Sequence, residues 1–170
     1  MKNKNMNRFV RIAMIAAAYA AVSLSLSPFT FGPVQIRIAE ALTLLPLIYE
    51  PAILGVTLGC FVTNLIGAAM GTNLLGFMDV GIGTAATFIA ALLTYRFRNV
   101  KCRDIPVWSI LMPVILNGVI IGIELGAVLF PNSVLIGSLI SGIEVAAGEL
   151  ASVIAGWFLI KTLKKTKLFQ

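Results

Sequence analysis

Residues 96 to 103 read Arg-Phe-Arg-Asn-Val-Lys-Cys-Arg, a basic octet set between two long apolar stretches. Of the 170 residues in the chain, 59% are hydrophobic and only 12% are charged. A soluble domain carries about 25% charged residues, so this composition is typical of a chain whose solvent is lipid. The octet is therefore expected to be a loop between membrane-spanning segments.

Basic residues occur almost only in this loop and near the two ends of the chain. Lys and Arg number 13 against 7 Asp and Glu, which gives a formal net charge of +6. Clusters of this kind beside apolar runs are typical of cytoplasmic loops. They do not form a groove, so nucleic acid is not expected as a partner. The clusters are Lys2, Lys4, Arg8 and Arg11; Arg96, Arg98, Lys101 and Arg103; and Lys161, Lys164, Lys165 and Lys167.

The apolar stretches predict an all-α membrane protein, a bundle of six transmembrane helices that forms one integral membrane domain over residues 1–170. A helix needs about 20 apolar residues to cross the hydrocarbon core, and fewer where it is buried in protein. The second segment is the shortest and contains Arg37, Glu40 and Pro46. The expected spans are 9–26, 34–49, 51–70, 74–95, 107–130 and 134–160.

The orientation of the chain in the membrane follows from whether the number of spans on each side of the basic octet is even or odd. If the basic octet is inside the cell, four spans before it and two after it place the N- and C-termini inside as well, as the positive-inside rule requires. The sequence thus predicts a multi-pass protein of the cell (plasma) membrane with cytoplasmic termini.

The sequence lacks the residues that several classes of chemistry require. The chain contains no His, which removes His-based metal sites and Ser-His-Asp catalysis. No Gly-x-x-x-x-Gly-Lys-Ser/Thr motif is present, so the chain is not expected to hydrolyse ATP. Cys60 lies in an apolar run and Cys102 in the basic loop, and they indicate neither a disulfide nor a metal site. We therefore expect no enzyme activity, no metal and no cofactor on this chain.

Small residues recur every four positions in three spans, a pattern that lets helix backbones approach closely in lipid. The two glycine ridges are expected to pack inside the bundle. The alanine ridge of the first span is instead a candidate surface for docking a partner subunit. The ridges are Gly55, Gly59, Thr63 and Gly67; Gly118, Gly122 and Gly126; and Ala13, Ala17 and Ala21.

Ionisable residues inside apolar runs are costly unless they are paired or face water, which makes them candidates for function. Threading the expected topology places all six of them in the outer half or the centre of the membrane. This shared depth predicts one cavity open to the outside. With three neutral polar residues, the candidate substrate-binding set is Gln35, Arg37, Glu40, Asn64, Asp79, Asn117, Glu124, Glu144 and Glu149.

Structural roles for some of these charges stay open. Arg37 and Glu40 are three residues apart and can neutralise each other on one helix face. Glu144 and Glu149 are five residues apart and diverge by about 140° on a helix, so only one of them needs to face the cavity. Glu149 is the deeper of the two and the preferred candidate.

The stretch Gly32-Pro-Val-Gln-Ile-Arg37-Ile-Ala-Glu40-Ala-Leu-Thr-Leu-Leu-Pro46 resembles the queuosine precursor transporter (QueT) family. These proteins are substrate-capture (S) components of energy-coupling-factor (ECF) transporters. The similarity extends over essentially the whole chain, and further matches are Leu58-Gly-Cys60, Asn64-Leu, the start of the fourth span with Asp79, Ala91-Leu-Leu-Thr-Tyr95, Asn117-Gly118 and Gly148-Glu149.

The resemblance implies a six-helix S-component fold and a purine-like ligand, a 7-deazaguanine precursor of queuosine. It also implies partners: an ECF transmembrane coupling protein and two ABC-type ATPases, with ATP used by the ATPases alone. The ridge of Ala13, Ala17 and Ala21 resembles the surface by which S components dock onto the coupling protein.

Other functions remain as alternatives. One is an S component for another vitamin-like small molecule, and another is a stand-alone carrier that uses its carboxylates as a proton relay. A membrane-embedded enzyme is disfavoured by the missing His and the missing Asp-x-x-Asp motif. A purely structural subunit is disfavoured because the intramembrane charges share one side of the membrane.

Overall fold

The fold is described by a computed structural model that covers residues 2–32 and 35–166. Within these residues the secondary structure is helical, without a strand. Five helices are long and apolar enough to cross a membrane, which makes the chain a multi-pass membrane protein. The elements are α1 (Lys2–Ser25), α2 (Ser27–Thr30), η1 (Ile38–Leu47), α3 (Ala52–Ala69), α4 (Met78–Arg96), α5 (Val107–Leu129) and α6 (Val134–Thr166).

Five of the expected spans correspond to these long helices, with shifted ends. Helix α1 begins at Lys2 and α6 continues to Thr166, because an amphipathic basic end can extend a helix beyond the lipid. Helix α4 begins at Met78 instead of residue 74, since Gly76 in the preceding turn has a positive φ of 62°.

The glycine ridges lie in helix contacts, as predicted. A Cβ atom on Gly59 would stand 2.6 Å from the Tyr19 Cβ, and one on Gly55 would stand 2.8 Å from that of Ile15, so α3 packs directly on α1. Gly118 and Gly122 do the same for α5 against α6. Small residues at these positions allow the close approach by which helices associate in lipid.

The second expected span is not an α-helix. Its central part is the 3-10 helix η1, and the residues just before it have no regular structure; residue 34, where the span was expected to begin, lies outside the described residues. Pro46 lies inside η1, where it has no N–H to donate and disfavours the α conformation of the residue before it.

Contact with α6 explains how this irregular segment fits. A Cβ on Gly148 would collide with the carbonyl of Gln35, and one on Gly156 would collide with the carbonyl of Ala41. The segment therefore lies directly on the α6 backbone. Helices α1, α3, α4 and α5 also pack against η1. Irregular backbone at membrane depth is tolerated only where protein encloses it in this way.

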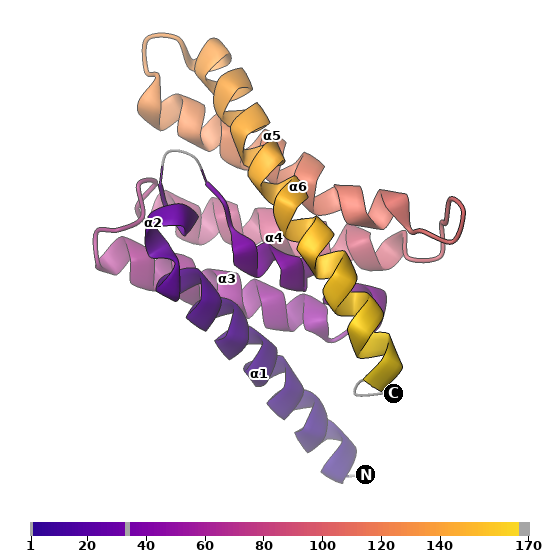
Figure 1. Ribbon diagram of the computed structural model, residues 1–170. Helices are drawn as coiled ribbons and strands as arrows, with labels where there is room; N and C mark the ends of the chain where they lie inside the picture. The colour runs from indigo at the N-terminus through magenta and orange to yellow at the C-terminus, as the bar shows by residue number, and fades with distance from the viewer. Residues whose placement is uncertain (1, 33–34, 167–170) are drawn as a thin grey trace.

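The segment also connects the two ends of the bundle. At one end, Arg11 lies over the ring of Tyr49 with 5.7 Å to its centroid, and Tyr95 donates a 3.2 Å hydrogen bond to Glu50. Phe31, before the segment, packs instead against Gly67 near the end of α3. The segment that contains η1 thus passes through the bundle from one end toward the other (Figure 1).

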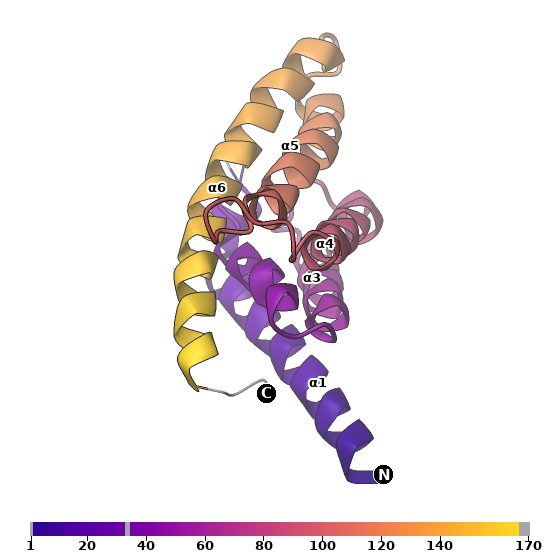
Figure 2. The same cartoon turned by 90° about the vertical axis from the view of Figure 1, so that its right-hand side faces the viewer.

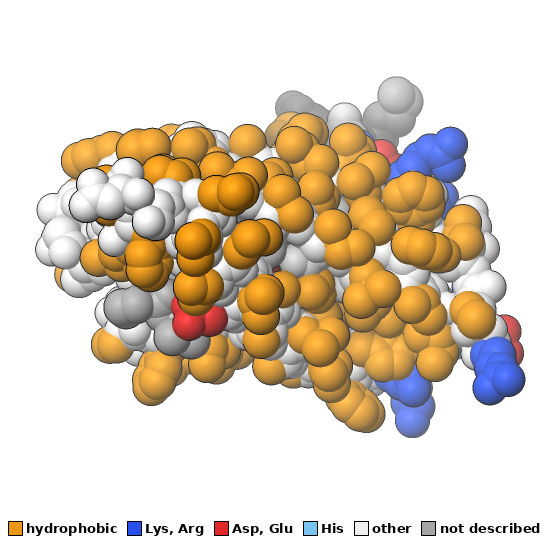
Figure 3. Space-filling view, turned by 90° about the horizontal axis from the view of Figure 1, so that it is seen from above, with side chains coloured by type: hydrophobic (Ala, Val, Ile, Leu, Met, Phe, Trp, Pro, Cys, Tyr) orange, Lys and Arg blue, Asp and Glu red, His pale blue; other side chains and the backbone are white. Residues whose placement is uncertain are grey.

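In Figure 1, the five long helices and the segment that contains η1 run alternately between two ends of the molecule. The first turn of α1 and the last turn of α6 lie toward the same end as the connection between α4 and α5, which faces the viewer in Figure 2. In the space-filling view, Lys and Arg side chains gather at that end, and hydrophobic side chains cover most of the rest of the visible face (Figure 3). This distribution fits a bundle surrounded by lipid.

Candidate functional site

Arg37 lies at the centre of a buried polar cluster. Only 2% of its surface is exposed, and it precedes η1 at a position from which it reaches α1 and α3. Its Nη2 donates to Cys60 Sγ at 3.2 Å and to Asn64 Oδ1 at 3.5 Å. Its Nε lies 3.8 Å from Glu40 Oε1, so the predicted neutralising pair of Arg37 and Glu40 forms. The guanidinium is thereby held in place without using all of its donors.

Glu40 is fully buried in η1 and receives hydrogen bonds from two other helices. The Tyr19 hydroxyl of α1 donates to Glu40 Oε1 at 2.5 Å, and the Thr87 hydroxyl of α4 lies 3.2 Å from the same oxygen. Charge-assisted bonds of this kind are stronger than neutral ones. The carboxylate thus ties η1 to α1 and α4 through one oxygen, and Oε2 has no partner.

Asp79 and Asn64 extend the cluster along α3 and α4. Asn64 Nδ2 donates to the backbone carbonyl of Asp79 at 2.8 Å. Asn73, in the connection between the two helices, donates to Asp79 Oδ2 at 2.9 Å. These bonds fix the start of α4 against α3, and Asp79 Oδ1 has no partner.

A second polar pair joins α5 and α6. Asn117 Nδ2 donates to Glu149 Oε1 at 2.5 Å, and both side chains are buried. Glu149 lies within electrostatic reach of Arg37 and Glu40. Glu124 of α5 in turn lies within reach of Asp79 and Arg37. The two polar groups therefore form one electrostatic unit in which four carboxyl groups surround a single guanidinium.

Many polar atoms of this unit are buried and have no hydrogen-bond partner among the described residues. Leaving such an atom unsatisfied costs about 1–3 kcal/mol, so native proteins rarely do so without a ligand or a water to complete the site. The orphaned atoms come from four elements, η1, α4, α5 and α6, and from the irregular residues just before η1. They are both amide atoms of Gln35, Arg37 Nε, Glu40 Oε2, Asp79 Oδ1, Asn117 Oδ1, both oxygens of Glu124 and Glu149 Oε2.

The structure brings together most of the residues that were selected from the sequence. Gln35, whose backbone touches α6 at Gly148, is 2% exposed. Glu144 is the exception, because it is only half-buried and makes no described hydrogen bond. Of the two α6 glutamates, Glu149 is the buried one, and it is the residue that its greater depth in the membrane had favoured. The remaining buried members are Arg37, Glu40, Asn64, Asp79, Asn117 and Glu124.

Sequence reasoning missed three members of the cluster: Tyr19, Cys60 and Thr87. Tyr19 lies in an alanine-rich span, and a tyrosine at that depth needs a partner for its hydroxyl, which is a usable signal. Cys60 and Thr87 are small enough to pass as core residues. Only the fold reveals that the Cys60 thiol accepts from Arg37 and lies 3.3 Å from the Thr87 hydroxyl.

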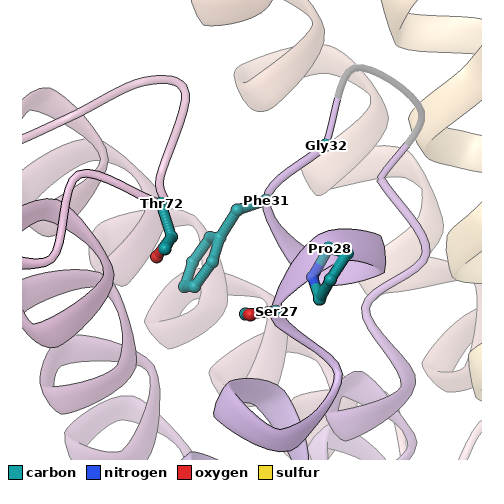
Figure 4. Close-up of a pocket in the computed structure, with 5 residues that line it drawn as sticks. All are labelled: Ser27, Pro28, Phe31, Gly32 and Thr72. Carbon is teal, nitrogen blue, oxygen red and sulfur yellow. The ribbon is translucent and has the colours of Figure 1, made fainter.

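A small pocket of about 240 Å³ lies at the end of the bundle opposite the termini. Figure 4 shows the Phe31 ring pointing toward Thr72 of the α3–α4 connection, with Ser27, Pro28 and Gly32 around it. Phe31 is buried, whereas Phe29 is 58% and Phe77 is 67% exposed, so only Phe31 belongs to the packed part of this end.

The alanine ridge of α1 points away from the bundle. Ala13, Ala17 and Ala21 are all exposed, while Ile15 and Tyr19 on the other face of the helix are buried against α3. The ridge is therefore not used for packing within this chain. A flat surface of small side chains remains open on the outside of the molecule.

The fold and the site define a multi-pass membrane protein that encloses a polar cluster with unsatisfied hydrogen-bonding capacity, a class that includes small-molecule transporters. A family model described as "QueT transporter" matches residues 9–165, and the chain belongs to this family of transporters. This membership agrees with the prediction that the chain is not an enzyme.

A curated relative supports the assignment. The "Queuosine precursor transporter QueT" of Lactococcus lactis subsp. cremoris (strain MG1363) is 29% identical over 105 residues. The match covers 58% of this chain and 58% of that relative, so this chain spans little more than half of the relative's length. No solved structure matches the chain significantly.

Proposed function

We propose that this chain captures a queuosine precursor, a 7-deazaguanine base, within the polar cluster around Arg37 and carries it across the cell membrane. The observation that carries the proposal is the set of buried donors and acceptors without partners, which four helical elements and the residues before η1 contribute to one electrostatic unit. Family membership and the named relative support the substrate class.

The chemistry of the cluster suits a guanine-type edge. A carboxylate accepts two parallel hydrogen bonds from the ring N–H and the exocyclic amine of such a base. Glu149 is the proposed acceptor, because its Oε2 is unpaired and Asn117 orients its other oxygen. The Nε of Arg37, which is paired with Glu40 by charge but has no hydrogen-bond partner, then donates to the ring carbonyl. The Gln35 amide completes the polar contacts.

We further propose six crossings with both termini in the cytoplasm. The alternating direction of the six segments supports this topology, as does the basic end that the termini share with the α4–α5 connection. The crossing between Phe31 and Tyr49 is then made by residues enclosed in protein. The ligand enters from the opposite, outer end, near Phe31.

The proposed role is that of an ECF S component. The chain then works with a transmembrane coupling protein and two ABC-type ATPases, and hydrolyses no ATP itself. The exposed ridge of Ala13, Ala17 and Ala21 is the proposed docking surface, since small side chains allow a partner helix to approach closely.

Mass spectrometry of small molecules released from the purified chain tests the substrate. We expect a 7-deazaguanine, chemically unchanged. Recovery of a different vitamin-like molecule would overturn the substrate assignment while keeping the binding role, and recovery of a modified product would indicate an enzyme.

A second candidate is a stand-alone proton-coupled carrier, which the four clustered carboxyl groups favour. Transport measurements on vesicles that contain this chain alone distinguish the two mechanisms. Uptake driven by a proton gradient without ATPases supports the carrier, and uptake only after addition of the coupling protein, the ATPases and ATP supports the ECF role.

A further inference from the structure

Helices α4 and α5 enclose a crevice of about 280 Å³ at the edge of the polar cluster. Glu124 belongs to both the crevice and the cluster, whereas the precursor contacts proposed above are made by Gln35, Arg37 and Glu149. The crevice is lined by Met78 and Ile82 of α4 and by Ile120, Ile123, Glu124 and Ala127 of α5. Met78 and Ile123 are 54% and 55% exposed, so the crevice opens on the outer, lipid-facing surface of the bundle. Five of its six lining residues have apolar side chains.

Glu124 is the exception, and it lacks a partner. The residue is only 3% exposed, and neither carboxyl oxygen has a hydrogen-bond partner among the described residues. A carboxyl group in apolar surroundings requires a donor. Arg37 is the nearby cation, but its described contacts are with Tyr19, Glu40, Cys60 and Asn64. None of the described residues therefore supplies the missing donor.

We propose that the α4–α5 crevice is a binding site for an amphiphile with a primary ammonium group on an apolar chain. Glu124 accepts hydrogen bonds from the ammonium group, and Met78, Ile82 and Ile123 contact the chain. A cation is preferred over a neutral hydroxyl because Asp79 lies within electrostatic reach of Glu124 and adds a second negative charge.

The bilayer is the source that fits the geometry. Glu124 lies five residues before Leu129, the last residue of α5, which corresponds to about 8 Å along the helix axis. A group at that depth is reached from the headgroup layer. Both an aminophospholipid headgroup and a free long-chain amine carry the required ammonium group, and the experiment distinguishes them.

The test is photolabelling of the full chain in phosphatidylcholine vesicles, which contain no primary amine. The probe is decylamine with a diazirine in its alkyl chain, and labelled peptides are mapped by mass spectrometry. We expect labelling concentrated at residues 78–82 and 120–127. Unlabelled decylamine should compete, and decane should not. Vesicles that contain phosphatidylethanolamine distinguish the two sources of the ammonium group. If this lipid competes with the probe, its headgroup is an occupant of the crevice, and if it does not compete, the free amine is the ligand.

The matched variants are Glu124→Gln and Glu144→Gln. Glu124→Gln removes the charge and nearly preserves the volume, and we expect crevice labelling to fall at least tenfold. Glu144 is half-buried on α6 outside the crevice, so its substitution should leave the labelling unchanged. Thermal unfolding of each variant shows whether the fold is retained.

Several outcomes overturn the proposal. Equal labelling of Glu124→Gln and wild type, or labelling spread evenly over the lipid-facing helices, shows that the crevice does not select an ammonium group. Competition by a 7-deazaguanine base instead of decylamine shows that Glu124 serves the central cluster. The labelling, its competition by decylamine and the comparison of the two variants are all made without the precursor, so this proposal can fail while the proposed function stands, and the proposed function can fail while this proposal stands.

Discussion

The Tyr19 hydroxyl donates a 2.5 Å hydrogen bond to Glu40 Oε1, which joins the first long helix to the irregular segment that carries Arg37. Glu40 is also 3.8 Å from the Arg37 guanidinium. One face of α1 therefore supports the polar cluster, and the opposite face carries the exposed alanine ridge. This arrangement connects the proposed ligand site to the proposed docking surface through a single helix.

Replacement of Tyr19 with Phe tests that connection. The substitution removes the donor to Glu40 and keeps the ring that packs against Gly59. An unsatisfied buried acceptor costs about 1–3 kcal/mol, so we expect a lower Tm and weaker precursor binding. Thermal unfolding and ligand titration in detergent measure both. Unchanged values for both would show that Glu40 does not depend on Tyr19.

Substitution of Gly59 by Ala should destabilise the packing of α1 on α3. The new Cβ would lie 2.6 Å from the Tyr19 Cβ and 3.0 Å from the Ala16 carbonyl, and overpacking of this kind costs about 1–3 kcal/mol. Gly81→Ala is the matched control, because a Cβ there meets nothing within 4 Å. Alanine is the better helix former by about 1 kcal/mol, so the control should keep or raise the Tm. Equal Tm shifts in the two variants would contradict the packing argument.

The long helices and much of the polar cluster could be predicted from the sequence alone. Apolar length and the basic octet are strong signals, and a charge such as Glu149 within an apolar run is rare enough to mark an interior position. The depth of a residue in the membrane, however, does not specify which side chains it contacts. The bonds of Asn73 to Asp79 and of Tyr19 to Glu40 depend on how the helices pack, which no periodicity encodes.

The second segment shows why its conformation was not predicted. Its composition fits a short apolar span, and hydropathy cannot distinguish an α-helix from a buried 3-10 helix. What decides the conformation is its environment, where α6 has glycines at positions 148 and 156 that accept backbone in place of side chains. Pro46 was a local signal against a regular α-helix. The effect of Pro46 on the conformation of the segment depended on the surface of α6, which is far away in the sequence.

Replacement of Ala17 with Leu should weaken assembly with the coupling protein and leave precursor binding intact. The added side chain would hold a partner helix away from the ridge, and Ala17 is exposed on the surface of this chain. Ala85→Leu, at an exposed alanine of α4, is the control. Co-purification of the complex is the measurement. Stoichiometric co-purification of the Ala17 variant would exclude the ridge as the docking surface.

Arg37→Ala and Glu149→Gln should each weaken precursor binding. Loss of a polar contact in a dry site costs about 1–3 kcal/mol, which corresponds to roughly 5- to 150-fold in affinity. Substitution of Lys161 or Lys164 should have no effect, since these residues lie at the basic end of α6. Arg37→Ala also leaves Glu40 without its cation, so Tm is measured alongside affinity. Wild-type affinity in both cluster variants would contradict the placement of the ligand.

The charges of the polar cluster also predict which charge the 7-substituent of the ligand should carry. Glu40, Asp79, Glu124 and Glu149 surround the single guanidinium of Arg37, so the acidic groups exceed the basic one by three if all are ionised. Burial of uncompensated negative charge is costly, and a cationic ligand reduces that cost, whereas a neutral one does not. We therefore expect the aminomethyl form of 7-deazaguanine to bind more tightly than the cyano form in a competition assay. Glu149→Gln removes one of the negative charges, so the difference in affinity between the aminomethyl and cyano forms should be smaller in that variant. Tighter binding of the cyano form by the wild-type chain would show that the carboxyl groups are protonated in the bound state and act as donors.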